Sequence, residues 1–160
     1  MTSTTIRHAT EQDTATIYEF IMRLARYEEL EHEVVATESE LRRTLFCENP
    51  YAEVVLISED ETPVGFALYF YNYSTFLGKP GLFLEDLYVE PAFRGRGLGK
   101  ALLTYLATLA VEKDCGRMEW NVLTWNKPAI SFYESLDAKP QEQWQTYRLT
   151  TPEIRRLANG

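Results

Sequence analysis

The sequence predicts a single α/β domain, in which helices cover a sheet of strands. Its 160 residues are 45% apolar and 25% charged, proportions typical of a folded domain with one hydrophobic core. Runs rich in β-branched and aromatic residues alternate with runs whose apolar residues recur every three or four positions. These periods are typical of strands and amphipathic helices, so both kinds of element are expected.

The first half of the chain is expected to contain two helices and a hairpin. A short strand begins at Ile6, an amphipathic helix ends near Tyr27, and a second helix begins after a Thr37 cap. An antiparallel hairpin follows, because the apolar runs 52–58 and 63–73 flank a polar turn. The order of elements therefore begins β α α β β.

The second half adds five elements in the order β α β α β. These are a strand within 82–91, a helix whose apolar face runs from Leu98 to Leu109, a strand over 118–124, a helix over 126–136 capped by Asn126, and a strand over 144–149. A helical turn can follow Thr151. Because no repeat or linker interrupts the order, one domain over residues 1–160 is expected.

Charge is distributed unevenly between the two halves. The net charge is −8, with 17 acidic and 6 basic residues in 1–90 but 7 acidic and 10 basic residues in 91–160. A nucleic-acid partner is not expected, because the acidic half would repel phosphates. The asymmetry suits a cationic ligand over the acidic half and an anionic ligand near the basic half.

Location and metal binding are also constrained by composition. No apolar run reaches the roughly 18 residues of a membrane span, and the first residues lack the apolar stretch of a signal peptide. We therefore expect a cytoplasmic protein with no membrane partner. Cys47 and Cys115 stand far apart with no CxxC motif, so neither a disulfide framework nor a metal site is expected.

The stretch 82–100 carries a strand, a glycine-rich turn and the start of a helix. It is not a P-loop, because Lys100 is followed by Ala101, and Lys100 also stands where the dinucleotide fingerprint needs its third glycine. The pattern R-x-x-G-x-G is present as Arg94, Gly97 and Gly99. Bent backbone, converging N–H groups, a helix N-terminus and basic side chains together predict a pyrophosphate site.

Two adjacent carboxylates interrupt the apolar strand before this turn. Glu85 and Asp86 lie between apolar residues, where desolvation of an ionised group is costly unless the group is paired or functional. Strict alternation would place Asp86 on one face with Leu84 and Tyr88, and Glu85 on the other. Only one of the two carboxylates is then expected to face a given cleft.

Several segments resemble a known enzyme family. The pattern R-x-x-G-x-G is similar to the acetyl-CoA signature of the GCN5-related N-acetyltransferase (GNAT) superfamily. YEELEHEV, FLEDLYVEPAFRGRGLG, WNKPAISFYESLDA and Trp144 resemble, in order and spacing, the spermidine/spermine N1-acetyltransferase family, which includes a thialysine-acetylating branch. The resemblance implies a single GNAT-type domain with a mixed central sheet flanked by helices, acetyl-CoA as acetyl donor, and a homodimer.

The resemblance also implies roles for individual residues. An alkyl amine with a pKa of about 10.4 is protonated at neutral pH, so a base must take its proton before it attacks. Glu85 would do so through a water, and Tyr133 would act as general acid toward the leaving thiolate. Tyr133 can alternatively pack only through its ring. The implied cofactor contacts are Leu87, Tyr88 and Val89 along the pantetheine arm, Arg94, Gly95, Arg96, Gly97, Leu98, Gly99 and Lys100 in the turn, and Asn126 and Tyr133.

The implied substrate residues are Tyr27, Glu28, Ser74, Thr75, Glu85, Asp86 and Trp144. The polyamine branch has an acidic residue where this chain has Ser74, whereas the thialysine branch resembles the Ser74–Thr75 pair. These hydroxyls can bond a substrate carboxylate or simply cap their loop, and both alternatives stay open here.

The expected function is transfer of acetyl from acetyl-CoA to the primary amine of a small cationic substrate, a thialysine-like lysine analogue or a diamine. Polyamine N1-acetylation is the first alternative. A protein or peptide acetyltransferase is the second alternative, together with a non-catalytic acyl-CoA-binding module. A non-catalytic module would be expected to lack the catalytic residues, whereas Glu85 and Tyr133 are both present.

Overall fold

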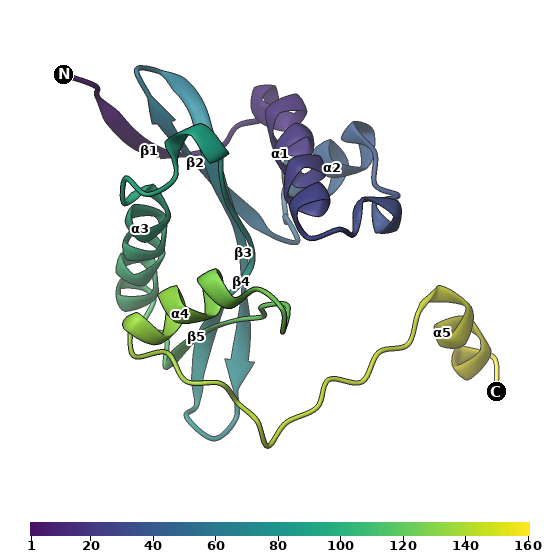
Figure 1. Ribbon diagram of the computed structural model, residues 1–160. Helices are drawn as coiled ribbons and strands as arrows, with labels where there is room; N and C mark the ends of the chain where they lie inside the picture. Colours follow the sequence, from purple (N-terminus) through teal and green to yellow (C-terminus); the bar gives the residue numbers. More distant parts are fainter. The chain divides into compact units, whose positions relative to one another are not determined.

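The computed structural model describes all 160 residues, in two compact units over 1–121 and 122–160 (Figure 1). The strands of the first unit are β1 (Thr4–His8), β2 (Glu53–Glu59), β3 (Thr62–Ser74), β4 (Lys79–Val89) and β5 (Arg117–Trp120). Its helices are α1 (Thr14–Tyr27), α2 (Glu38–Leu45) and α3 (Leu98–Glu112), with short 3-10 turns at Glu11–Asp13, Glu31–Glu33 and Pro91–Phe93. The second unit contains α4 (Lys127–Ser135) and α5 (Thr151–Ala158).

The five strands form one mixed sheet in the order β1-β2-β3-β4-β5. Neighbouring strands from β1 to β4 are antiparallel, and β5 pairs with β4 in parallel. The parallel pair requires a crossover, which α3 supplies between β4 and β5. The predicted α/β class with a mixed sheet flanked by helices is therefore confirmed.

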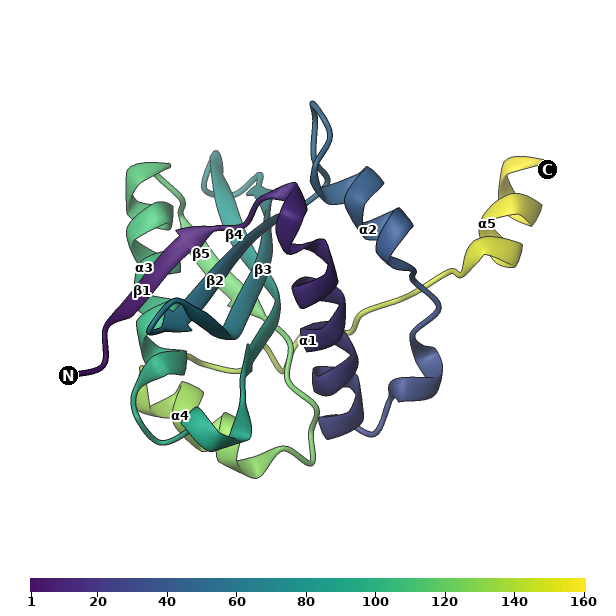
Figure 2. The same ribbon diagram turned by 90° about the horizontal axis from the view of Figure 1, so that it is seen from above.

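Helices cover both faces of the sheet. Figure 2 shows α3 on one side of the strands and α1, with α2 beside it, on the other. The face under α1 carries a buried cluster of apolar side chains from four elements: Ile17, Phe20, Val54, Leu56, Phe66, Leu68 and Tyr88. On the opposite side, α3 contributes buried leucines, among them Leu102 and Leu106. The strands therefore carry apolar residues on both faces, which explains their nearly continuous apolar runs.

Side-chain caps begin two of the predicted helices. At α2 the Thr37 hydroxyl accepts a hydrogen bond from the N–H of Glu40, while the Glu40 side chain bonds back to the N–H of Thr37. At α4 the Asn126 side chain accepts from the N–H of Ala129 at 3.4 Å. Both predicted caps are confirmed. None of the helices combines the length and the apolar character that crossing a bilayer demands.

The predicted last strand over 144–149 is wrong. This segment has no strand or helix assignment, and Trp144 and Tyr147 are 75% and 89% exposed. A strand needs a neighbour for its backbone N–H and C=O groups, and no strand of this chain pairs with the segment. The pattern of aromatic residues does not show whether a partner strand is present.

Candidate functional site

The two adjacent carboxylates of β4 lie at a β-bulge. In the register between β3 and β4, Leu68 pairs with Asp86 and Tyr69 pairs with Leu84, which leaves Glu85 without a partner residue. The extra residue shifts the alternation of side chains, so Asp86 and Leu84 lie on opposite faces of the sheet. The expectation that Asp86 shares a face with Leu84 is therefore wrong.

The bulge gives the two carboxylates different surroundings. Asp86 lies on the face covered by α1, because its partner Leu68 and the nearby Tyr88 belong to the apolar cluster that α1 completes. Glu85 is exposed, whereas Asp86 is partly buried. Of the two carboxylates, Asp86 is therefore the one with apolar surroundings.

A third carboxylate, Glu28, lies at the end of α1. Glu28 is the C-cap, and Glu29 follows in the left-handed region with a φ of 60°. The N–H of Leu30 donates to the carbonyl of Ala25 at 2.8 Å, and the N–H of Glu29 donates to the carbonyl of Arg26 at 3.1 Å. This pair of bonds is a Schellman motif. It fixes the backbone of Glu28 at the helix end.

The three carboxylates interact electrostatically. Burial raises the pKa of Asp86 to about 7, and the negative charges of Glu85 and Glu28 contribute to the increase. Burial also raises the pKa of Glu28. A carboxyl group that titrates near neutral pH can accept a proton there, and a concentration of negative charge favours a bound ammonium group. No cluster of His, Cys, Asp or Glu side chains in the structure is arranged to hold a metal ion.

The glycine-rich turn presents backbone N–H groups to open space. Gly95 and Gly97 have φ angles of 75° and 81°, which side chains other than glycine rarely adopt. Because α3 begins after Gly97, the N–H groups of Leu98, Gly99 and Lys100 have no carbonyl partner within the helix. A Cβ atom added at any of the three glycines would meet no atom within 4 Å. The turn therefore fits a diphosphate, which the helix dipole would also favour.

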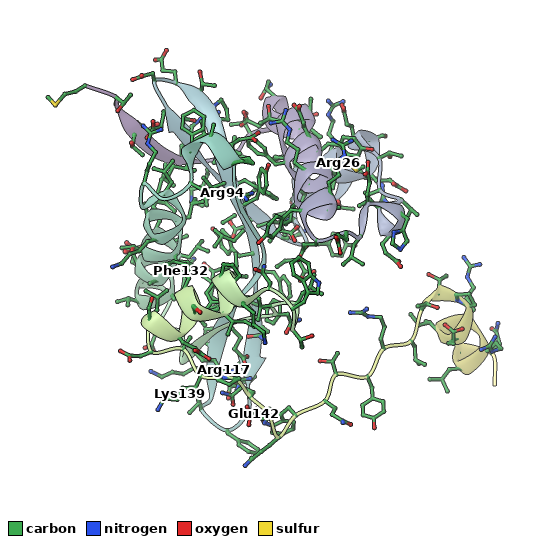
Figure 3. All side chains as sticks on the ribbon, in the orientation of Figure 1. Arg26, Arg94, Arg117, Phe132, Lys139 and Glu142 are labelled. Carbon is green, nitrogen blue, oxygen red and sulfur yellow. The ribbon has the colours of Figure 1, made fainter.

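Two of the three cations of the turn already have protein partners. Arg96 pairs with Glu59 of β2, with 3.0 Å between Nη2 and Oε2, and the Glu59 side chain is 8% exposed. Arg94 lies between β4 and α3 on the side toward α1 (Figure 3), and its Nε donates to the carbonyl of Val89 at 2.8 Å. Lys100 is exposed and makes no ion pair. Of the three charges expected at a phosphate, Lys100 alone is uncommitted.

A shallow hollow lies beside this turn. Its volume is about 510 Å³, and Ile6, Gly97, Lys100 and Thr104 are among its lining residues. None of the three carboxylates is among its lining residues. The geometry of the turn and the bulge is the better guide to the place where the chemistry is expected.

One edge of β4 is open after the bulge. The parallel strand β5 pairs with β4 only over residues 81–84. Further along, the N–H of Glu90 donates to the carbonyl of Val64 on the β3 side, so the alternation of backbone directions turns the N–H and C=O groups of Leu87 and Val89 to the other edge. The carbonyl of Val89 already accepts a hydrogen bond from Arg94 there. That edge is able to bind an extended chain by strand-like hydrogen bonds.

The remaining predicted residues of the second unit lie on its own elements. Asn126 is buried at the start of α4, and Tyr133 lies within α4, with its ring 5.6 Å from that of Phe132. Trp144 is mostly exposed in the segment that precedes α5. The cap function expected of Asn126 is seen directly, as described above.

Ser74 and Thr75 lie at the tip of the β3–β4 hairpin. Ser74 is 3% exposed, and its Oγ accepts a hydrogen bond from the N–H of Leu77 at 3.2 Å. Of the two alternatives for this hydroxyl, the structure favours loop capping. At roughly 3.3 Å per strand residue, the hairpin tip lies far along β4 from Glu85. Within one chain, these two residues therefore do not join the carboxylates.

Comparisons with known proteins agree with this architecture. The acetyltransferase (GNAT) family model matches residues 15–138, a range that includes parts of both units. A thialysine N-epsilon-acetyltransferase of Mus musculus is 37% identical over 99% of this chain and 99% of its own. An L-ornithine N5-acetyltransferase of Arabidopsis thaliana is 34% identical over 91% of this chain and 83% of its own.

A solved structure shows the same arrangement of elements. An integron cassette protein from the mobile metagenome of V. cholerae superimposes with a TM-score of 0.82 at 26% identity, covering 99% of both chains. The resemblance to the GNAT superfamily and its thialysine branch, inferred above from the motifs, is confirmed by these matches. The chain therefore belongs to the acetyltransferase (GNAT) family and is an N-acetyltransferase, an enzyme that moves an acetyl group to an amine.

Proposed function

We propose that this enzyme acetylates the side-chain amine of a small cationic substrate, a lysine analogue such as thialysine or a related diamine. The observation that carries the proposal is the group of Glu28, Glu85 and Asp86, which concentrates negative charge beside the strand that leads into the glycine-rich turn. An ammonium group is attracted to such a group of acids. The relatives named for thialysine and for L-ornithine act on amino acids whose side chains end in an amine.

Acetyl-CoA would be held by the glycine-rich turn and the open edge of β4. The N–H groups of Leu98, Gly99 and Lys100 would bind its diphosphate, and the backbone of Leu87 and Val89 would bind its pantetheine arm. Asn126 and Tyr133 of the second unit are proposed as further contacts, from the family resemblance. When bound, acetyl-CoA supplies an acetyl thioester that a neutral amine can attack.

The proton of the substrate ammonium is the first chemical problem. Glu85 is exposed and can accept this proton through a water molecule, as the family resemblance implies. Asp86 is a second candidate, because its pKa of about 7 lets it exchange a proton near neutral pH. We propose that the pair deprotonates the amine. The resulting lone pair forms the new N–C bond as the C–S bond breaks.

The departing thiolate is the second problem. We propose the hydroxyl of Tyr133 as the donor that protonates the sulfur, on the strength of the family resemblance. The substrate would be oriented by Glu28 at the end of α1, with Tyr27 beside it and Trp144 as a further contact. Half-burial strengthens the attraction of the Glu28 carboxylate for a cation, because less water screens it.

A homodimer is part of the proposal. Trp144, Tyr147 and Leu149 are 75%, 89% and 52% exposed in a segment with no strand partner in its own chain. Aromatic and apolar side chains of this kind are usually covered, and an unpaired extended backbone favours pairing with another chain. A second copy, related by twofold symmetry, would cover the segment. Sedimentation at micromolar concentration tests this; a mass near 18.6 kDa would contradict it.

The substrate class is tested with a panel of amines and acetyl-CoA. The panel contains thialysine, lysine, ornithine, putrescine, spermidine and a peptide with a free N-terminus, and release of the CoA thiol and the mass of the product are both measured. We expect the highest kcat/KM for thialysine or ornithine. A preference for spermidine would support the polyamine alternative, and acetylation of the peptide alone would contradict the proposal. Binding of acetyl-CoA without turnover of any amine would support the non-catalytic alternative.

A further inference from the structure

Five side chains between α1 and the end of β4 form a ring that is linked by four contacts and closed by the backbone of α1. The guanidinium carbon of Arg94 lies 5.0 Å from the ring centre of Tyr27 and 5.5 Å from that of Tyr88. The Tyr88 hydroxyl donates to Glu90 at 3.2 Å, and Glu90 forms an ion pair with Arg23. Arg23 and Tyr27 are one helical turn apart on α1, which closes the ring.

Arg94 is the central member of this ring. Its guanidinium is in contact with two aromatic rings, and its Nε donates to the carbonyl of Val89 at 2.8 Å. A planar guanidinium stacks on aromatic rings while it donates in its own plane. These three partners hold the guanidinium between α1 and the end of β4. Lys100 has no such partners, although it belongs to the same turn.

The contacts connect two parts of the proposed site. Tyr27 precedes Glu28 at the end of α1, while Tyr88 and Val89 follow Asp86 on β4. Movement of the last turn of α1 would therefore change the position of the Glu28 carboxylate relative to that of Asp86. The mutual influence of these two acids is already visible in the electrostatics.

We propose that Arg94 is a positioning residue, which holds the last turn of α1 and its Glu28 against the end of β4, rather than a phosphate ligand. Its effect on amine acetylation rests on the proposed function, but its effect on the helix does not. The first experiment therefore measures only the stability of the end of α1, in the whole protein. Hydrogen exchange is measured for the N–H groups of residues 28–30, each of which bonds back to a carbonyl of α1.

Arg94→Gln is compared with Lys100→Gln, a matched change of one cation on the same turn. In the protein without ligands, Arg94→Gln is expected to speed exchange at residues 28–30 by roughly 10-fold, because the cation–π contacts and the charged hydrogen bond are lost. Lys100→Gln should leave exchange at these N–H groups within twofold of the original protein. Equal exchange rates in the two variants would overturn the proposal whether or not the enzyme acetylates thialysine.

The second experiment separates positioning from phosphate binding by means of a truncated donor. S-acetylpantetheine carries the thioester and the pantetheine arm but lacks the diphosphate and the nucleotide. The loss of kcat/KM for thialysine caused by Arg94→Gln, expected to be roughly 10-fold, should persist with this donor and appear mainly in the KM for the amine. The loss caused by Lys100→Gln should shrink.

Conservative variants complete the test. Arg94→Lys keeps the charge over the rings but loses the planar donor to Val89, so its amine KM should fall between those of the original protein and Arg94→Gln. Tyr27→Phe keeps the ring face and should preserve slow exchange at residues 28–30, whereas Tyr27→Leu should not. A loss in Arg94→Gln that disappears with S-acetylpantetheine would make Arg94 a phosphate ligand and overturn the proposal.

Discussion

Arg96 of the glycine-rich turn forms an ion pair with the largely buried Glu59 at the end of β2, with 3.0 Å between Nη2 and Oε2. The hydroxyl of Thr4 donates to the other carboxylate oxygen of Glu59 at 3.2 Å. The turn is thus tied to the end of β2, next to the edge strand β1. Because the charge of Arg96 is already compensated, it adds less to a phosphate site than its position in the motif suggests.

Donor affinity should therefore depend on Lys100 more than on Arg96. Lys100→Gln is expected to raise the Kd of acetyl-CoA by roughly 10-fold, as befits a charged hydrogen bond. Arg96→Gln should change it less than about threefold and lower stability by about 1 kcal/mol, since one half-exposed partner of the pair is removed. Calorimetric titration and thermal unfolding measure the two effects. A greater loss of affinity in Arg96→Gln would mean that Arg96 leaves Glu59 when the donor binds.

The two carboxylates of the bulge are distinguished by their amide variants. Glu85→Gln should lower kcat by roughly 10²- to 10⁴-fold while the Kd of acetyl-CoA changes little, because a general base is lost but the donor contacts remain. Asp86→Asn is the matched control on the adjacent residue. A loss of this size in Asp86→Asn and none in Glu85→Gln would transfer the base to Asp86.

Most elements of the fold were predictable because their signals are local. The Thr37 cap and its partner Glu40 are three residues apart, and Asn126 caps a helix whose first turn contains Pro128. The apolar periods of β2, β3 and α3 also lie within single runs of sequence. Local hydrogen bonds and side-chain periods decide these elements, so a single sequence contains the necessary information.

The candidate site was less predictable because it depends on contacts between distant segments. The bulge at Glu85 follows from the register between β3 and β4, and a run of apolar residues does not record a register. The partners of Arg94 and Arg96 on α1 and β2 lie far away in sequence. The prediction of a strand over 144–149 was wrong for a related reason, since a strand needs a partner strand.

The buried Asp86 should make stability depend on pH. Its pKa of about 7 in the folded protein lies above the roughly 3.9 of an unfolded Asp. Between these values the folded state retains a proton that the unfolded state has lost, so the contribution of Asp86 to the free energy of unfolding falls as pH rises from about 4 to 7.

Asp86→Asn should remove this dependence of stability on pH, so comparing the variant with the original protein measures it. The variant should be about as stable as the original protein near pH 4 and more stable by about 2–4 kcal/mol at pH 8. Urea unfolding at both values of pH measures the difference. Glu85→Gln is the comparison: because the negative charge of Glu85 contributes to the raised pKa of Asp86, this variant should weaken the pH dependence without removing it. A constant difference between Asp86→Asn and the original protein from pH 4 to 8 would contradict the assignment.

The end of α1 stores backbone strain that a glycine should release. Glu29 has a φ of 60° in the Schellman motif, a conformation that costs a side-chain-bearing residue about 1–2 kcal/mol. Glu29→Gly should raise the free energy of unfolding by about 0.5–1 kcal/mol after the greater chain entropy of glycine is counted. Glu29→Ala is the control, since it removes the charge but keeps the strain. Equal stabilisation by both variants would point to charge repulsion instead.

The hairpin tip provides the last prediction. Because Ser74 is buried and caps its loop, Ser74→Ala should lower the free energy of unfolding by about 1 kcal/mol and leave the ratio of kcat/KM between spermidine and thialysine within twofold. Ser74→Asp should also leave that ratio unchanged while it destabilises the loop, because a carboxylate would be placed where little water reaches it. The ratio is measured for both variants under identical donor concentrations.

Thr75→Asp is the matched control, because Thr75 is the exposed neighbour of Ser74 and its replacement introduces the same charge without disturbing the cap. The loop can contact the distal group of the substrate in its own chain or in a partner chain. If it does, an acid at position 75 should raise kcat/KM for spermidine relative to thialysine, because it attracts the distal ammonium of spermidine. An improved ratio in Ser74→Asp with no change in Thr75→Asp would show that the Ser74 side chain leaves its cap to contact substrate. No change in either variant would leave Glu28 and Asp86 as the groups that select the cation.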